Sequence, residues 1–205
     1  DGDKAKAEAA AEEIARAGWQ VRDDFVYKGR PLSETVAEAA ALTDGPIVLL
    51  DHSDNAASGA TQDVMTVIAE VMRQGLEDVA VAAVWDPAAV QEMAKAGPGA
   101  TVTLKLGGKT DMPSINLKGK PLTVTGKVKA LTDGEFVIRG TMATGTKAQL
   151  GPAAVLDTGK MEIVVVSRHH EPFDLVIFRH CGIEPVKKRF LMLKSRIHYR
   201  AGFKP

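Results

Sequence analysis

The stretch "PIVLLDHSDNAASGATQDVMTVIAEVM", residues 46–72, decides the fold because it predicts a strand, a polar loop and a helix in that order. The apolar run Ile47–Leu50 is short and continuous, which is typical of a buried parallel strand. From residue 61 to 74 the apolar side chains recur at three- and four-residue steps, which predicts an amphipathic helix. In a parallel sheet, the loop between such a strand and helix is the usual position for a ligand.

The next segment repeats this alternation. The apolar run "DVAVAAVWD", residues 78–86, predicts a second strand, and Pro87 begins a helix that extends to about Ala96. Two strands that alternate with two helices favour a small parallel α/β core.

After Gly99 the pattern changes to β-branched segments separated by turn signals such as "GGK" and "TDGE". A final strand is expected in "FLMLKSRIHYRAGF", residues 190–203. The predicted fold class is therefore α+β, with a small parallel α/β core (strand-helix-strand-helix) followed by an antiparallel β-rich section.

The N-terminal residues predict two further helices, over residues 4–18 and 31–42. The first has a narrow apolar face that includes Ile14 and Trp19, and such a helix needs a partner surface. That partner is either the rest of this chain or a surface outside it.

Composition excludes several classes of function. The chain has 26 Lys and Arg against 26 Asp and Glu, so no strong field for nucleic acid or an anionic membrane is expected. No apolar run is long enough to span a membrane, and the charged N-terminus lacks the apolar region of a signal peptide. We therefore expect a cytoplasmic protein. The lone Cys181 excludes an internal disulfide and a multi-cysteine zinc site.

The loop after the first strand carries polar residues that could bind a ligand: Asp51, Asp54, Asn55 and Asp63. A helix N-terminus favours anions, but these carboxylates disfavour a phosphate. They suit a metal ion, an ammonium group or amide N–H donors better. The alternative is helix capping, with Ser58 or Thr61 as N-cap and Asp63 in the first turn.

The C-terminal segment is rich in cations. In a strand, one face would present Lys194, Arg196, His198 and Arg200. Such a face could hold a carboxylate or stabilise an oxyanion. The alternative is a solvated edge whose charges resist pairing with another sheet. The adjacent His169 and His170 would point to opposite faces of a strand, which does not suit one shared metal.

Five motifs in this order resemble the C-terminal part of the MlrC family, the microcystinase C-like metallopeptidases: "DHSDNAASGATQD", "AVAAVWDPAAV", "ATVTLKLGGK", "VVVSRHHEPFD" and "LKSRIHYRAGF". The resemblance runs from about Gly45 to the end of the chain. Residues 1–30 resemble the last segment of the family's N-terminal metallopeptidase region, so residues 31–205 would form the C-terminal domain.

The resemblance implies a zinc-dependent hydrolase of amide bonds, with linearised microcystin and its tetrapeptide as the family's named substrates. It also implies that one zinc ion is held mainly by ligands in the N-terminal part of the same enzyme, which would be this chain's partner. Where relatives are glycine-rich, this chain has "NAASGATQD", which retains Asn55, Gly59 and Asp63 in a stiffer loop. A different substrate specificity is therefore expected.

Position and chemistry assign roles to eight residues within this resemblance. Lys194 and His198 are expected to polarise the scissile carbonyl or bind a substrate carboxylate. The expected binders of a peptide or small amide substrate are Asp51, Asp54, Asn55, Gly59, Asp63 and Arg196. A homo-oligomer remains open. The alternative function is a non-catalytic binding or interaction module that lacks a complete metal site.

Overall fold

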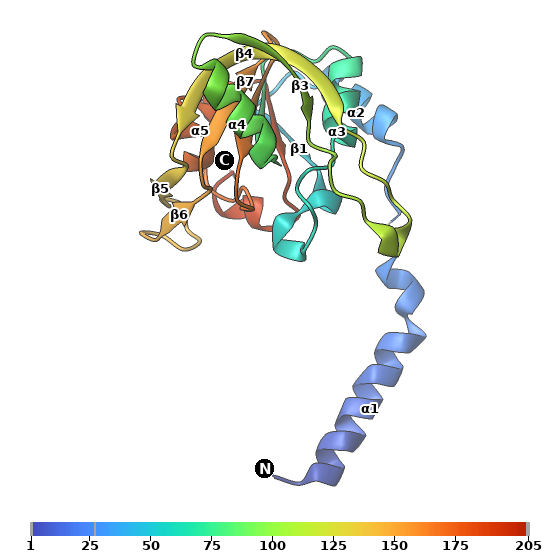
Figure 1. Cartoon of the computed structure of the whole chain (residues 1–205). Helices are drawn as coiled ribbons and strands as arrows, with labels where there is room; N and C mark the ends of the chain where they lie inside the picture. Colours follow the sequence, from blue (N-terminus) through green and yellow to red (C-terminus); the bar gives the residue numbers. More distant parts are fainter. Residues whose placement is uncertain (1, 27, 204–205) are drawn as a thin grey trace.

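A seven-stranded mixed sheet forms the centre of the computed structural model, which describes residues 2–26 and 28–203 (Figure 1). Its strands, in spatial order, are β1 Ile47–Leu50, β9 Phe190–Leu193, β2 Val79–Trp85, β8 Met161–Val166, β7 Ala153–Asp157, β4 Leu122–Thr132 and β3 Thr101–Leu106. The first four are parallel, and the pairs from β8 to β3 are antiparallel. The predicted α+β class, with a parallel and an antiparallel part, is confirmed.

Two strands occupy positions that the sequence order does not suggest. We expected the strands after Gly99 to form an antiparallel section, but β8 and β9 both join the parallel half. β9 lies between β1 and β2 and pairs with both. The last strand of the chain therefore brings residue 194 beside the loop that follows β1.

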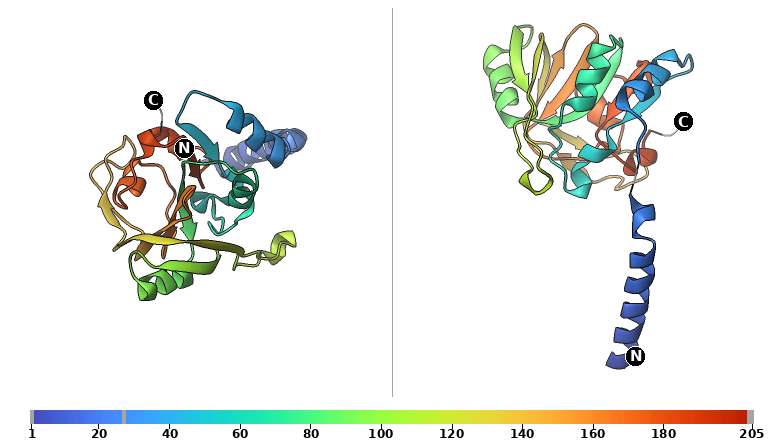
Figure 2. Two further views of the ribbon diagram at one scale, coloured as in Figure 1. Left: turned by 90° about the horizontal axis from the view of Figure 1, so that it is seen from above. Right: turned by 90° about the vertical axis from the view of Figure 1, so that its right-hand side faces the viewer.

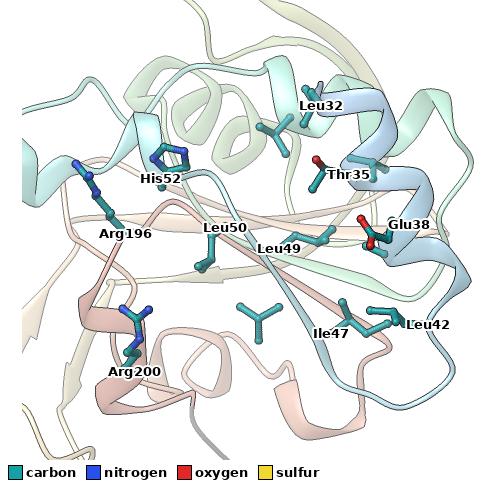
Figure 3. A pocket seen from close by; sticks show the side chains of 14 residues that line it. Leu32, Thr35, Glu38, Leu42, Ile47, Leu49, Leu50, His52, Arg196 and Arg200 are labelled. Carbon is teal, nitrogen blue, oxygen red and sulfur yellow. The ribbon is translucent and has the colours of Figure 1, made fainter. Parts of the chain in front are cut away.

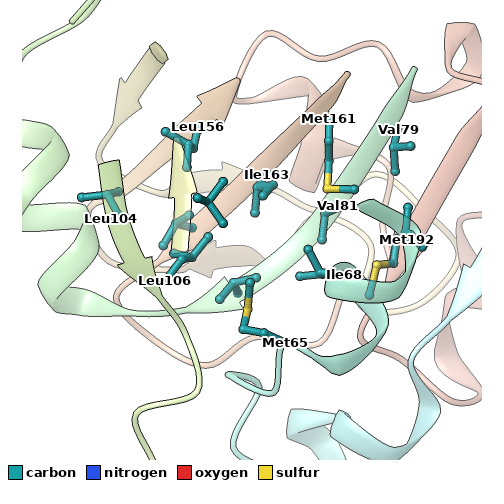
Figure 4. Packing of buried hydrophobic residues seen from close by; sticks show 14 of the residues in the cluster. Met65, Ile68, Val79, Val81, Leu104, Leu106, Leu156, Met161, Ile163 and Met192 are labelled. Atoms are coloured by element: carbon teal, nitrogen blue, oxygen red, sulfur yellow. The ribbon is translucent and has the colours of Figure 1, made fainter. Parts of the chain in front are cut away.

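Three helices cover one face of the sheet: α2 Leu32–Ala41, α3 Thr66–Arg73 and α4 Pro87–Ala96. Figure 4 shows part of this core, in which Ile68 of α3 packs near Val81 of β2 and Met192 of β9. Alternate residues of β2, such as Ala80, belong to a second core on the opposite face. That second core contains α5 Val176–Arg179 and the hairpin of β5 Glu135–Val137 and β6 Lys147–Gln149.

Short 3-10 helices form most of the remaining regular structure: η1 Arg22–Phe25, η2 His52–Asp54, η3 Ala56–Ser58, η4 Pro113–Ile115, η5 Pro185–Lys187 and η6 His198–Ala201. The predicted final strand is wrong beyond Leu193, because the chain turns there and continues into η6. As a result, Lys194 and His198 do not share a strand face.

The start of α3 also differs from prediction. The helix begins at Thr66 and has no side-chain cap, so neither Ser58 nor Thr61 is its N-cap. Asp63 precedes the helix rather than lying in its first turn. The acidic residues of this loop therefore do not cap α3.

The first helix, α1 Lys4–Gln20, projects away from the rest of the molecule (Figures 1 and 2). It continues past Gly18, where we expected it to end, and no residue within it is buried. Ile14 is 73% exposed and Trp19 is 70% exposed.

The predicted division between residues 30 and 31 stays a prediction. No helix in the described part of the chain is long and apolar enough to cross a membrane.

Two partly buried histidines lie against the ring of Phe136. The ring centroids of His170 and His180 lie 6.0 Å and 4.9 Å from that of Phe136. Burial lowers the pKa of both imidazoles below their ordinary value of 6.5. The folded protein therefore favours the neutral rings.

This burial predicts a stability that depends on pH. Below about pH 6.5 the unfolded chain binds protons that the folded chain resists, so the free energy of unfolding should fall as the pH decreases through the lowered pKa values. Urea unfolding between pH 7.5 and 5 measures this. The variant with His170→Gln and His180→Gln should show a flatter dependence than a His169→Gln control. An equal slope in both variants would contradict the assignment.

Candidate functional site

The loop from residue 51 to 64 is built around a buried lysine. Lys194 follows β9 and is fully buried. Its Nζ donates to Asp51 Oδ2 at 2.8 Å, to Asp54 Oδ2 at 2.7 Å and to the carbonyl oxygen of Val64 at 2.5 Å. These three acceptors use all three N–H groups of the ammonium. The two aspartates and the lysine thus form a buried ion network with a formal net charge of −1.

Asp54 also closes the loop on itself. Its Oδ1 accepts from the N–H of Gln62 at 2.7 Å, and its Oδ2 accepts from the N–H of Val64 at 2.9 Å. Asn55 Oδ1 accepts from the N–H of Ala57, and Gly59 has a left-handed φ of 84° that a side chain would strain. Four of the predicted substrate-binding residues therefore specify the shape of this loop: Asp51, Asp54, Asn55 and Gly59.

Asp63 and Asp86 hold the neighbouring loop, which follows β3. Asp63 Oδ2 accepts from the N–H groups of Lys109 and Thr110 at 2.8 and 2.9 Å. Asp86 accepts from the N–H of Gly107 and from Lys109 Nζ. A Cβ atom at Gly107 would lie 2.6 Å from the Asp63 carbonyl oxygen. The two loops are therefore too close together for any residue larger than glycine at this position. Within the described residues, Asp63 Oδ1 is buried without a hydrogen-bond partner.

The lysine network predicts a large loss of stability when its cation is removed. Lys194→Met should leave two buried carboxylates without their counter-ion and lower the free energy of unfolding by about 3–5 kcal/mol. Urea denaturation at neutral pH measures the difference. The matched control is Lys105→Met at the exposed surface of β3, which should change stability by less than about 0.5 kcal/mol. A similarly small effect at Lys194 would show that the network does not hold the loop.

A second polar cluster lies beside η6. The buried carboxylate of Glu171 accepts from Ser195 Oγ at 2.6 Å through Oε1, and its Oε2 lies 2.6 Å from His198 Nδ1. The side chain of His198 is 47% exposed. A carboxylate on Nδ1 fixes the orientation of an imidazole and leaves Nε2 for a further partner.

Sequence reasoning missed Glu171 as a site residue. It follows the histidine pair in "SRHHEPFD", but its partners Ser195 and His198 are 24 and 27 residues away. The only signal was a carboxylate beside two histidines. The adjacent histidines themselves have other surroundings, because His169 stacks on Trp85 at 4.4 Å whereas His170 packs on Phe136 and Phe173.

Two classes of reactive centre do not fit the residues present. Burial raises the pKa of Cys181 to about 12, so its thiol stays protonated and is a poor nucleophile. Across residues 2–26 and 28–203, no group of three His, Cys, Asp or Glu side chains is arranged to hold a metal ion. The expectation that metal ligands lie in an N-terminal part stays a prediction.

Arg196 lies apart from the lysine network. With His52 and Arg200 it lines one end of a cavity of about 600 Å³ that runs beside β1, while α2 forms the opposite wall (Figure 3). The predicted site residues are thus divided among the buried loop network, the Glu171–His198 pair and this cavity. Lys194 and His198 are only four residues apart, but the side chain of Lys194 is buried whereas that of His198 is about half exposed.

The fold and these clusters define an α+β domain with a tightly specified polar loop at the carboxyl ends of its parallel strands. The chain belongs to the MlrC C-terminus family, whose model matches residues 49–205. This confirms the resemblance inferred from the motifs.

Two relatives show how much of a longer protein this chain corresponds to. Microcystinase C from Sphingomonas sp. is 33% identical over 174 residues, which are 85% of this chain and 33% of that protein. A crystal structure from Mesorhizobium sp. BNC1, provisionally described as a metallopeptidase, aligns with a TM-score of 0.81 and 21% identity. The alignment covers 93% of this chain and 37% of that one, and it supports the fold. The chain therefore spans about a third of the length of both relatives.

Proposed function

We propose that this chain is the C-terminal part of a metal-dependent amide-bond hydrolase that acts on a peptide or small amide. Membership of the MlrC C-terminus family and the likeness to microcystinase C support this assignment. We further propose that the metal is zinc and that the N-terminal part of the same enzyme holds it. The described residues of this chain do not themselves form a metal site.

The observation that carries the proposal is the pairing of a half-exposed histidine with a buried carboxylate. Glu171 holds His198 at Nδ1, and Ser195 holds the other oxygen of Glu171. The imidazole Nε2 is thereby fixed on a ring that solvent and substrate can reach. From there it can hydrogen-bond to the scissile carbonyl oxygen or to a substrate carboxylate.

Lys194 acts indirectly in this proposal. All its ammonium protons are donated within the protein, so it positions the loop rather than contacting substrate. Asp51 and Asp54 have the same role, because both bind Lys194 and backbone N–H groups donate to both oxygens of Asp54. Arg196, which is exposed two residues before His198, remains available to a substrate carboxylate.

We also propose a partner surface on the N-terminal segment. Ile14, Trp19 and Phe25 are all at least 70% exposed on α1 and η1, which leaves substantial apolar area uncovered. Packing of this segment on the N-terminal part of the same enzyme would bury that area.

The proposal is tested by replacing the histidine and its carboxylate in the full-length enzyme. His198→Gln should lower kcat about 100-fold, because it removes a group that acts in the transition state. Glu171→Gln should lower kcat about tenfold, because the ring loses its fixed orientation. Amide hydrolysis is measured by product chromatography, with circular dichroism as the check of folding.

Lys105→Gln, at the exposed surface of β3, is the control and should retain full activity. Normal turnover in both the His198 and the Glu171 variants would refute the role of this pair. A full-length protein that binds peptides but hydrolyses none, with metal supplied, would instead support a non-catalytic binding module.

A further inference from the structure

β1 is an apolar strand that the domain leaves half covered. It stands at one end of the strand order, next to β9. Every residue of β2 except Trp85, and all of β8 and β9, are buried, whereas in β1 only Leu49 is. The strands of a parallel sheet are normally covered on both faces. The sequence of β1 is therefore that of an inner strand in an edge position.

The backbone of β1 has bonding capacity on its outer side. The N–H of Ile47 donates to Arg189 and that of Asp51 donates to Leu193, both toward β9. Because successive N–H groups of a strand point to opposite edges, those of Val48 and Leu50 point outward. All four residues of β1 line the cavity of about 600 Å³.

The layers on both faces of the sheet extend beyond this edge. On one face α2 packs on Leu49 through Val36 and Ala39. On the other face, Val48 and Leu50 pack against the second core together with Tyr199 of η6. Figure 3 shows Leu50 on the side of the segment that carries Arg200. The space between the two layers continues the plane of the sheet, so it has the position and shape that one more strand would occupy.

The charges at this edge are asymmetric. The guanidinium groups of Arg196 and Arg200 lie at the carboxyl end of β1, where His52 also lies (Figure 3). Arg200 lies over the ring of Tyr199 at 4.9 Å, which limits its conformations. A strand that added parallel to β1 would bring its own carboxyl end to these cations, and a bidentate carboxylate fits a guanidinium.

We propose that a short apolar peptide with a free C-terminal carboxylate binds as an added strand parallel to β1. Its backbone pairs with Val48 and Leu50, and its carboxylate binds Arg196 and Arg200. This inference rests on the proposed function and names its substrate class. The segment that supplies both arginines also carries His198.

The test uses two probes with the 205-residue chain, the tetrapeptide acetyl-Val-Ala-Val-Ala with a free carboxylate and the same peptide with a C-terminal amide. Nuclear magnetic resonance follows amide shifts and hydrogen exchange. The acid form should shift the Val48 and Leu50 amides and slow their exchange. It should bind about tenfold more tightly than the amide form, because only the acid makes charge-assisted hydrogen bonds.

Arg196→Gln should remove most of the preference for the acid form while leaving the affinity for the amide form unchanged. The matched control, Lys105→Gln, removes an exposed cation at the opposite edge of the sheet and should change neither affinity. Equal affinity of the unmodified chain for the acid and amide forms would overturn the carboxylate assignment. Unchanged amide shifts and hydrogen exchange of Val48 and Leu50 at saturating peptide would overturn the added strand.

Other occupants of the edge give distinct results. Protection of the Val48 and Leu50 amides that rises with protein concentration, without peptide, would show pairing with a second copy. Protection in the full-length enzyme without peptide would show a strand from the rest of that enzyme. Either result overturns the proposal. Because binding is measured without turnover, loss of hydrolysis in His198→Gln with intact peptide binding separates this inference from the proposed function.

Discussion

A single buried ammonium group organises the end of the sheet where the site lies. Lys194 joins the last strand of the chain to the loop after the first strand by binding Asp51, Asp54 and the carbonyl of Val64. Removing two carboxylates from water costs several kcal/mol each unless a cation and further hydrogen bonds compensate them. Here the lysine and the N–H groups of Gln62 and Val64 supply that compensation. The acidic loop can therefore be rigid and buried rather than solvated.

This constraint fixes what lies around it. β9 ends at Leu193, directly before the buried Lys194, and the following residues form the turn that leads into η6. That turn brings Ser195 and His198 to the two oxygens of Glu171 and leaves the two arginines beside β1. One short segment, residues 194–200, thus contributes to the buried network, to the oriented histidine and to the cationic end of the cavity.

The sequence predicted the local elements well where periodicity was strong. The runs 47–50 and 78–86 predicted β1 and β2, and Pro87 marked the start of α4. It failed for the final segment because Lys194, Arg196 and His198 alternate as an exposed strand face would. A lysine in such a pattern is normally solvated, and nothing local shows that its partners lie 140 and 143 residues away. Glu171 was missed for the same reason.

The sequence by itself determined the strands and helices, the position of the polar loop and the family, because these depend on residues close together in the chain or on motifs in order. Only the tertiary structure decided which polar groups are hydrogen-bonded inside the protein and which are exposed. The insertion of β9 between β1 and β2 buries Lys194 against the aspartates and exposes the outer edge of β1. Burial depends on strand order, and strand order is set by contacts between distant segments rather than by local pattern.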